Sequence, residues 1–324
     1  MNRSRITILS ALAAAIALTG FSLAATSSLT GMQEAITGQW FLTRSNADGF
    51  VHLTLQRSGP NLHFNSSNNV QISELRGLSA AQLGSNGGPA RFEIVRDAGT
   101  IECEGFFKNG KGSGTFLFKP NQAFVADMRS LRYEEITDDG LFSLALHDVR
   151  LEFVRGLIAA GYDRPAFDRL VSMRIHGVSL DFIADLRSLG YDRVPIDSLV
   201  SMRIHSATTE FVRELTELGY ERVPVDQLVS MRIHNVESAF IKELREHGYT
   251  KVPVDQLVSM KIHSVTTAFI AELKELGYER VPVDELVSMK IHSVTSEFIR
   301  RMKERGEKDL SIEHLISLRI HGSD

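Results

Sequence analysis

Six histidines recur at a constant interval of 29 residues and form a histidine ladder: His176, His205, His234, His263, His292 and His321. Imidazole nitrogen is a common metal ligand and general base, so both chemistries must be weighed. Zinc–nitrogen bonds are about 2 Å long, but equivalent residues of stacked helical repeats lie roughly 10 Å apart. Neighbouring ladder histidines therefore cannot share one ion, no carboxylate partner is obvious beside them, and we expect neither a metal nor another cofactor.

A serine stands four residues before each of these histidines, for example Ser201 before His205. One helical turn brings two such side chains together, but a Ser–His pair needs an orienting acid and an oxyanion hole to catalyse acyl transfer. The chain also lacks an HExxH zinc motif, a phosphate-binding loop and a GxSxG nucleophile elbow. The sequence therefore predicts a protein that is not an enzyme.

A histidine at the end of a short helix also has a structural explanation, because it interacts well with the partial negative charge there and can cap free carbonyl groups. A basic residue stands two positions before each ladder histidine. These cations could follow a row of phosphates, but a solvated face that pairs with acidic residues is the favoured interpretation. The ladder positions expected to be exposed are weak candidates for an interaction surface: Arg203, His205, Arg232, His234, Lys261, His263, Lys290 and His292.

The residues around each histidine define a sequence repeat, as in Val225–His234 (VDQLVSMRIH) and Val254–His263 (VDQLVSMKIH). A fixed period of about 20 to 50 residues is the signature of a solenoid. We expect two short helices in each unit, which are marginal alone and must stack on their neighbours. Phenylalanines and tyrosines in the same register reach upstream to Phe124 and Tyr133. The predicted α-solenoid of two-helix 29-residue repeats therefore covers residues 120–324.

The unit at residues 194–220 shows the expected details of one repeat. Asp197 is predicted to cap the first helix, and Thr208 or Thr209 the second. Gly219 is predicted to end the second helix in a left-handed conformation. The apolar face of the first helix is expected to comprise Leu199, Val200, Met202 and Ile204.

The N-terminus is typical of an export signal. Two arginines precede an uncharged apolar run from Ile6 to Ala25, and small residues near Ala24 suit cleavage. We expect residues 1–25 to be a secretory signal peptide, with an uncleaved membrane anchor as the alternative. Its removal changes the net charge from −4 to −6, because the segment carries two arginines and no acid. Export and acidity both argue against nucleic acid as a partner.

At residues 36–119, between the signal peptide and the repeat array, hydrophobic residues recur at every second position instead of every third or fourth. Five segments read as strands: Gln39–Arg44, Phe50–Gln56, Arg91–Val95, Gly99–Lys108 and Lys111–Lys119. Asn109-Gly110 predicts a hairpin turn, and the polar segment Asn65–Asn69 reads as a loop. The prediction is a small antiparallel β-domain of five or six strands, a sandwich or barrel. The fold class is α+β in separate domains.

Aromatic side chains should form the core of this β-domain: Trp40, Phe50, Phe92, Phe116 and Phe118. Cys103 is the only cysteine, so no intrachain disulfide is possible, and it reads as a buried strand thiol. A ligand-binding or hydrolytic β-domain, with the repeats as scaffold, is the alternative function. That alternative requires convergent polar groups, for instance His52, His63, Glu93 and Glu104.

Strings such as LVSMRIHGVS and LRSLGYDRVPID, at 29-residue spacing, resemble an uncharacterised helical repeat of exported bacterial proteins. The segment Gly99–Pro120 resembles the one that precedes those repeats. Similar modules follow the membrane metallopeptidase domain of beta-lactam-sensor/antirepressor-type proteins. This chain lacks that domain, so the resemblance implies neither protease activity nor a zinc site. It implies a sensing or interaction module in the cell envelope.

These observations predict an exported, non-enzymatic protein-interaction or sensing module, periplasmic or secreted. The repeat array is the expected binding surface, and another envelope protein or a peptide is the expected partner. Membrane contact is expected only through an uncleaved signal segment. A glycan ligand for the repeats, and an array that serves only as a spacer, are the other readings that the sequence allows.

Overall fold

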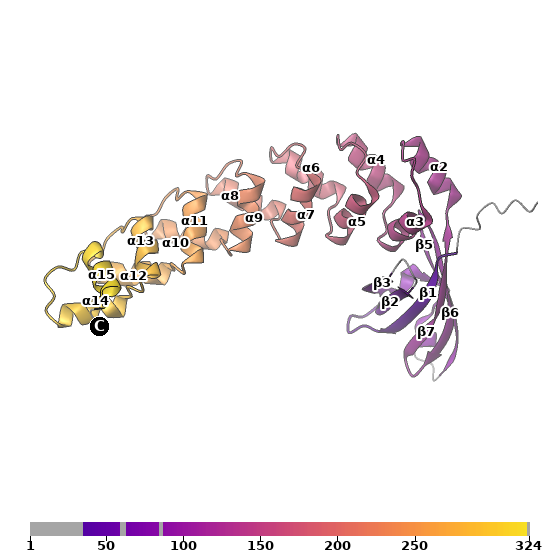
Figure 1. Cartoon of the computed structure of the whole chain (residues 1–324), viewed down its shortest axis with the longest axis horizontal. Coiled ribbons are helices and arrows are strands. Elements are labelled where there is room, and N and C mark those ends of the chain that lie inside the picture. Colours follow the sequence, from indigo (N-terminus) through magenta and orange to yellow (C-terminus); the bar gives the residue numbers. More distant parts are fainter. Residues whose placement is uncertain (1–34, 59–62, 84–86, 323–324) are drawn as a thin grey trace, which may run out of the picture. The chain divides into compact units, whose positions relative to one another are not determined.

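The computed structural model describes residues 35–58, 63–83 and 87–322. The predicted signal peptide, residues 1–25, lies outside these ranges. A β-sheet comes first in the chain, and a long series of helices follows it (Figure 1), within one compact unit that begins at Ile36. The predicted fold class, a β-domain followed by a helical repeat array, is confirmed. None of the helices in the described ranges is long and apolar enough to span a membrane.

Seven antiparallel strands form one curled sheet in the described part of the chain, in the order β3-β2-β1-β7-β6-β5-β4 (Figure 1). The strands are β1 (Thr37–Arg44), β2 (Phe50–Ser58), β3 (His63–Gln71), β4 (Leu75–Arg76), β5 (Gly88–Arg96), β6 (Gly99–Lys108) and β7 (Lys111–Pro120). The short helices η1 (Ile72–Glu74) and α1 (Ala80–Leu83) connect β3 to β5 around β4. Asn109 and Gly110 both have positive φ and form the β6–β7 turn, as predicted. The expectation of five or six strands in a sandwich or barrel is wrong: among the described residues, seven strands form one sheet, and its two end strands, β3 and β4, are not paired with each other.

The predicted loop at Asn65–Asn69 is part of strand β3, which pairs with β2 along its whole length. As an edge strand it has no apolar alternation to reveal it, since most of its side chains are exposed. Polar cross-strand contacts stand in for apolar pairs: the Ser67 hydroxyl lies 2.8 Å from Thr54 Oγ1 and 2.7 Å from His52 Nε2. Cross-strand pairs of this kind stabilise a sheet without a hydrophobic signal.

Buried aromatic rings fill the inner face of the sheet. Trp40, Phe92, Phe116 and Phe118 are buried as predicted, but Phe50 is only half-buried. The Trp40 ring meets Phe92 edge-to-face, with ring centroids 5.0 Å apart. Cys103 is fully buried, and burial raises the pKa of its thiol well above the ordinary value. The buried strand thiol is therefore confirmed.

The helix α3 (Asp138–Leu146) packs against strands β6 and β7 and completes this core. Its Phe142 ring stacks on Phe116 at 5.6 Å and contacts Phe64 and Phe118 edge-on at 5.5 and 5.3 Å. The aspartate Asp97, in the β5–β6 turn, accepts a hydrogen bond of 2.9 Å from the backbone N–H of Leu151, at the start of the next helix. The first repeats and the sheet therefore form a packed junction.

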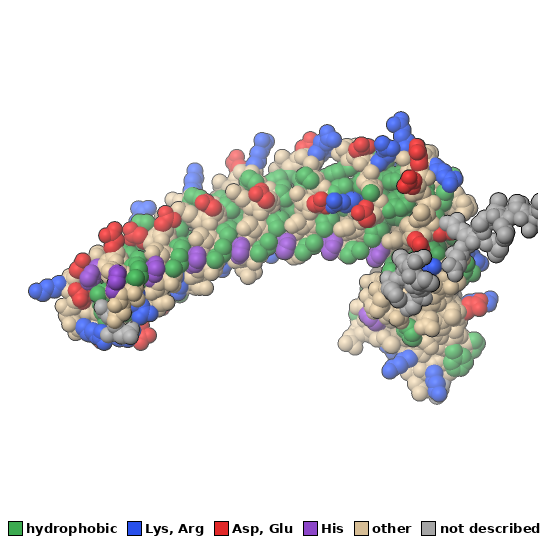
Figure 2. Space-filling view, viewed as in Figure 1, with side chains coloured by type: hydrophobic (Ala, Val, Ile, Leu, Met, Phe, Trp, Pro, Cys, Tyr) green, Lys and Arg blue, Asp and Glu red, His purple; other side chains and the backbone are tan. Residues whose placement is uncertain are grey.

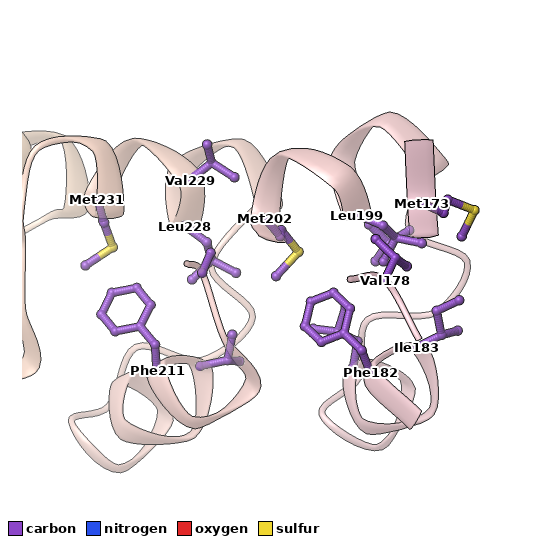
Figure 3. Packing of buried hydrophobic residues seen from close by; sticks show 14 of the residues in the cluster. Met173, Val178, Phe182, Ile183, Leu199, Met202, Phe211, Leu228, Val229 and Met231 are labelled. Atoms are coloured by element: carbon purple, nitrogen blue, oxygen red, sulfur yellow. The ribbon is translucent and has the colours of Figure 1, made fainter. Parts of the chain in front are cut away.

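The helices of the array have nine residues each and form two rows. The first-helix row comprises α3, α5 (Phe167–Ile175), α7 (Ile196–Ile204), α9 (Val225–Ile233), α11 (Val254–Ile262), α13 (Val283–Ile291) and α15 (Ile312–Ile320). The second-helix row comprises α2 (Gln122–Ser130), α4 (Leu151–Ala159), α6 (Leu180–Ser188), α8 (Thr209–Glu217), α10 (Ser238–Glu246), α12 (Thr267–Glu275) and α14 (Ser296–Glu304). Each helix contacts the next member of its own row. Leucines and methionines of the first helices point toward phenylalanines of the second helices, as Figure 3 shows for Met202 and Phe182.

The ends of the helices follow the same local rules in each repeat. Thr208 caps α8, since its hydroxyl accepts a hydrogen bond of 3.2 Å from the Phe211 N–H. The prediction that Asp197 caps α7 is wrong: the N-cap is Pro195, and Asp197 lies inside the first turn, where its charge still suits the helix dipole. Gly219 has a φ of +75° and ends α8, as predicted.

Candidate interaction face of the first-helix row

An isoleucine at the end of each first helix from α5 to α15 is largely exposed. The exposed fractions are 48–55% for Ile175, Ile204, Ile233, Ile262, Ile291 and Ile320, which we call the isoleucine row. Apart from these six, the large apolar residues exposed in the described ranges are Phe41, Val95 and Phe106, all in the sheet. One exposed isoleucine is ordinary, but six at equivalent positions along one row form an extended apolar surface.

The exposure of the isoleucine row contradicts the prediction that Ile204 belongs to the apolar core face. Leu199 and Met202 point into the core and are fully buried. At about 100° per residue, Ile204 lies about 140° around the helix from Leu199 and about 160° from Met202. The half-buried Val200 lies only about 40° from Ile204, on the same side. Each first helix therefore has a buried side and a second, exposed apolar side.

An acidic residue accompanies each isoleucine of the row, seven residues before it. Two helical turns separate the two positions, so both lie on the same side of the helix. The six acids are Asp168, Asp197, Asp226, Asp255, Asp284 and Glu313, all exposed. Asp197 pairs with Arg169, and Asp284 accepts a hydrogen bond of 3.3 Å from Gln256. The two aspartates are nevertheless exposed to solvent. The first-helix face, defined by these acids and the isoleucine row, is apolar and negative.

The histidine ladder borders the isoleucine row, and Figure 2 shows the histidines in a line beside hydrophobic side chains. Each histidine is the C-cap residue of its helix, as predicted. His321 Nδ1 lies 2.9 Å from the Ser317 carbonyl oxygen and 3.3 Å from its hydroxyl. Among the described residues, the other five ladder histidines form no side-chain hydrogen bond. His205, His234, His263 and His292 are half-buried, whereas His176 and His321 are exposed.

The basic residues of the ladder do not form an exposed stripe. Arg203 lies over the Phe182 ring of the preceding repeat, 5.2 Å from its centroid, and Arg232 lies over Phe211 at 5.1 Å. Lys261 and Lys290 stack in the same way on phenylalanines 21 residues earlier. These four side chains are half-buried, so the expectation that they are exposed is corrected. The expected pairing with an acid holds for Arg232, which lies 3.2 Å from Glu237. Their repetition is explained by a contact between repeats.

The polar residues named for a β-domain site do not converge. His52 lies on β2, while Glu104 and Glu93 lie on β6 and β5, with β1 and β7 between. The His63 side chain lies outside the described part. Glu104 does border a half-open hollow of about 760 Å³ on the outer face of the sheet. The described residues contain no group of three or more His, Cys, Asp or Glu side chains placed to hold a metal ion.

Comparison of this chain with protein families, curated proteins and solved structures found no match.

Proposed function

We propose that this protein is an exported, non-enzymatic interaction or sensing module of the bacterial envelope, whose first-helix face binds another envelope protein. The single observation that carries the proposal is the isoleucine row, with six isoleucines about half exposed at equivalent positions. Export rests on the apolar N-terminal run of the sequence. The resemblance to exported bacterial repeat proteins supports the same location.

The size of the apolar surface supports an interface of useful strength. Fully burying an isoleucine contributes about 1.5–3 kcal/mol, so covering the exposed half contributes about 1 kcal/mol. Four central isoleucines would then contribute ~4 kcal/mol, which corresponds to roughly a thousandfold in Kd. Repeat proteins present extended surfaces of this kind to their partners.

The charge of the first-helix face indicates the chemistry of its partner. One exposed acid per repeat accompanies the isoleucine row, and the ladder cations are turned toward phenylalanine rings. A protein surface with apolar and basic side chains complements such a face. Nucleic acid does not, because its phosphates would meet a row of carboxylates.

The proposal is tested by capture from the native cell envelope with the full exported chain as bait. The β-domain must be retained, because truncation at residue 120 would separate Phe142 from Phe116 and Phe118. Replacing Ile204, Ile233, Ile262 and Ile291 with glutamine alters the proposed face; glutamine is a good helix former of similar length.

A matched control replaces glutamates with glutamine at the same 29-residue spacing on the second-helix row, at Glu217, Glu246, Glu275 and Glu304, all exposed. A partner that is captured by the wild type and the control, but not by the isoleucine variant, supports the proposal. Equal capture by both variants, with both chains folded, would contradict it.

A further inference from the structure

The outer face of the sheet carries two exposed phenylalanines in one cross-strand row. Phe41 on β1 and Phe106 on β6 both pair with Ser113 on β7, one from each side. Their exposed fractions are 41% and 53%. Neighbouring strands lie about 4.8 Å apart, so the two phenylalanines stand roughly 10 Å from each other across the Ser113 strand.

The adjacent rows of the same face border the hollow of about 760 Å³. Gln39 pairs with Gln56 on one side and with Thr115 on the other, and Thr115 pairs with Glu104. These amide, hydroxyl and carboxylate groups all line the hollow, together with Thr37, Glu102 and Leu117. Because amides and hydroxyls both donate and accept hydrogen bonds, the lining suits a ligand that does the same.

The charges around this hollow are balanced. Glu104 pairs with Arg91 at 2.5 Å, and Glu102 pairs with Lys119 at 2.6 Å. The two carboxylates are therefore already neutralised by their basic partners and do not need a cationic ligand. A neutral ligand rich in hydroxyl groups satisfies the lining without breaking either pair.

We propose that this face of the sheet, from the Phe41–Ser113–Phe106 row to the Gln39–Glu104 row, binds a neutral linear glycan. A sugar ring has a face of C–H bonds that packs on an aromatic ring, which carries partial negative charge on its own face. Two phenylalanines separated by one strand support two sugars of one chain, while hydroxyls reach the amides in the hollow. The site is independent of the first-helix face proposed above.

The test is calorimetric titration of the full exported chain with four hexasaccharides of defined linkage: cellohexaose, chitohexaose, maltohexaose and xylohexaose. Single variants are Phe41→Ser, Phe106→Ser and Gln39→Ala. All three residues are exposed or partly exposed, so their side chains do not hold the core. The matched control is Val95→Ser, since Val95 is a similarly exposed apolar residue on β5. Unchanged fluorescence of Trp40, the only tryptophan, reports an intact sheet.

At least one hexasaccharide is expected to bind, and each phenylalanine variant is expected to weaken that binding about tenfold, as for the loss of one aromatic contact. The Val95→Ser variant should bind as the wild type does. Absence of binding by all four sugars overturns the proposal. Binding that survives both phenylalanine substitutions overturns it as well, and so does tighter binding of a neutral peptide such as (Gly-Thr-Gln)4 to the same residues.

Discussion

The six tyrosines of the chain form hydrogen bonds that link successive repeats, and removing one hydroxyl is the sharpest test of how the array is held together. Each tyrosine hydroxyl donates to a backbone carbonyl 32 residues later, at 2.6–2.9 Å. The chain has no other tyrosine. Tyr220, for example, donates to the Val252 carbonyl at 2.8 Å. Tyr220→Phe removes this one bond and keeps the ring.

The expected cost follows from the position of the bond. A hydrogen bond of this kind contributes about 0.5–1.5 kcal/mol, and a carbonyl left without a partner adds to the loss. We therefore expect Tyr220→Phe to lower the free energy of unfolding by about 1 kcal/mol. The bonds of Tyr191, Tyr220 and Tyr249 belong to different repeats, so the triple Phe variant should lose ~3 kcal/mol, close to the sum.

The measurement is urea unfolding followed by far-ultraviolet circular dichroism. Thr54→Val is a matched control, because it deletes a hydroxyl whose bond to Ser67 is exposed to water. This control should change stability by less than about 0.5 kcal/mol. A triple tyrosine variant as stable as the wild type would refute the view that these bonds connect the repeats.

Three further changes test other parts of the account. Burial raises the pKa of Tyr133 to about 12 from 10.0 and raises the pKa of the other tyrosines. The unfolded chain thus loses these protons first, so the stability that the tyrosines contribute is fully present below pH 10 and is lost from pH 10 to about 12, in parallel with tyrosinate absorbance; a free energy of unfolding that does not change between pH 10 and pH 12 would contradict this. Glu237 stands at the N-cap of α10 without a side-chain cap bond, and its exposed carboxylate pairs with Arg232 at 3.2 Å. A threonine cap contributes about 1 kcal/mol and an exposed ion pair about 0.5 kcal/mol, so Glu237→Thr should raise the free energy of unfolding by about 0.5 kcal/mol, measured by urea unfolding; destabilisation would contradict the capping argument. Arg203→Ala should lower it by about 1 kcal/mol through the lost contact with Phe182, and an unchanged urea midpoint would show that this contact is unimportant.

The repeat architecture could be predicted from the sequence because its determinants are local and occur many times. The first helix ends at His205, the second helix ends at Gly219, and Thr208 caps the second helix. Each of these features depends on residues within one turn. The exposed side of the first helix could also be predicted from the sequence. The angle between Ile204 and Leu199 follows from helix geometry alone, whereas the apolar character of Ile204 by itself wrongly predicts burial.

The features that could not be predicted from the sequence depend on contacts between distant segments. Phe142 completes the sheet from a helix that follows it in the chain, so nothing local in α3 predicts this packing. Strand β3 is held by its pairing with β2, although its own composition is typical of a loop. The stacking of Arg203 on Phe182 also joins different repeats. The hollow beside Gln39 and Glu104 exists only once four strands are aligned.

The most direct test of the proposed function is photo-crosslinking in the native envelope. A photoreactive phenylalanine analogue is placed at Ile233, in the middle of the isoleucine row, and at Glu246 on the second-helix row as the control. The account predicts one discrete crosslinked protein from position 233, absent from position 246. It also predicts loss of that product when Ile204 and Ile262 are replaced by glutamine. Equal crosslinking from both positions, or none from 233 while the partner still binds, would contradict the first-helix face as the binding surface.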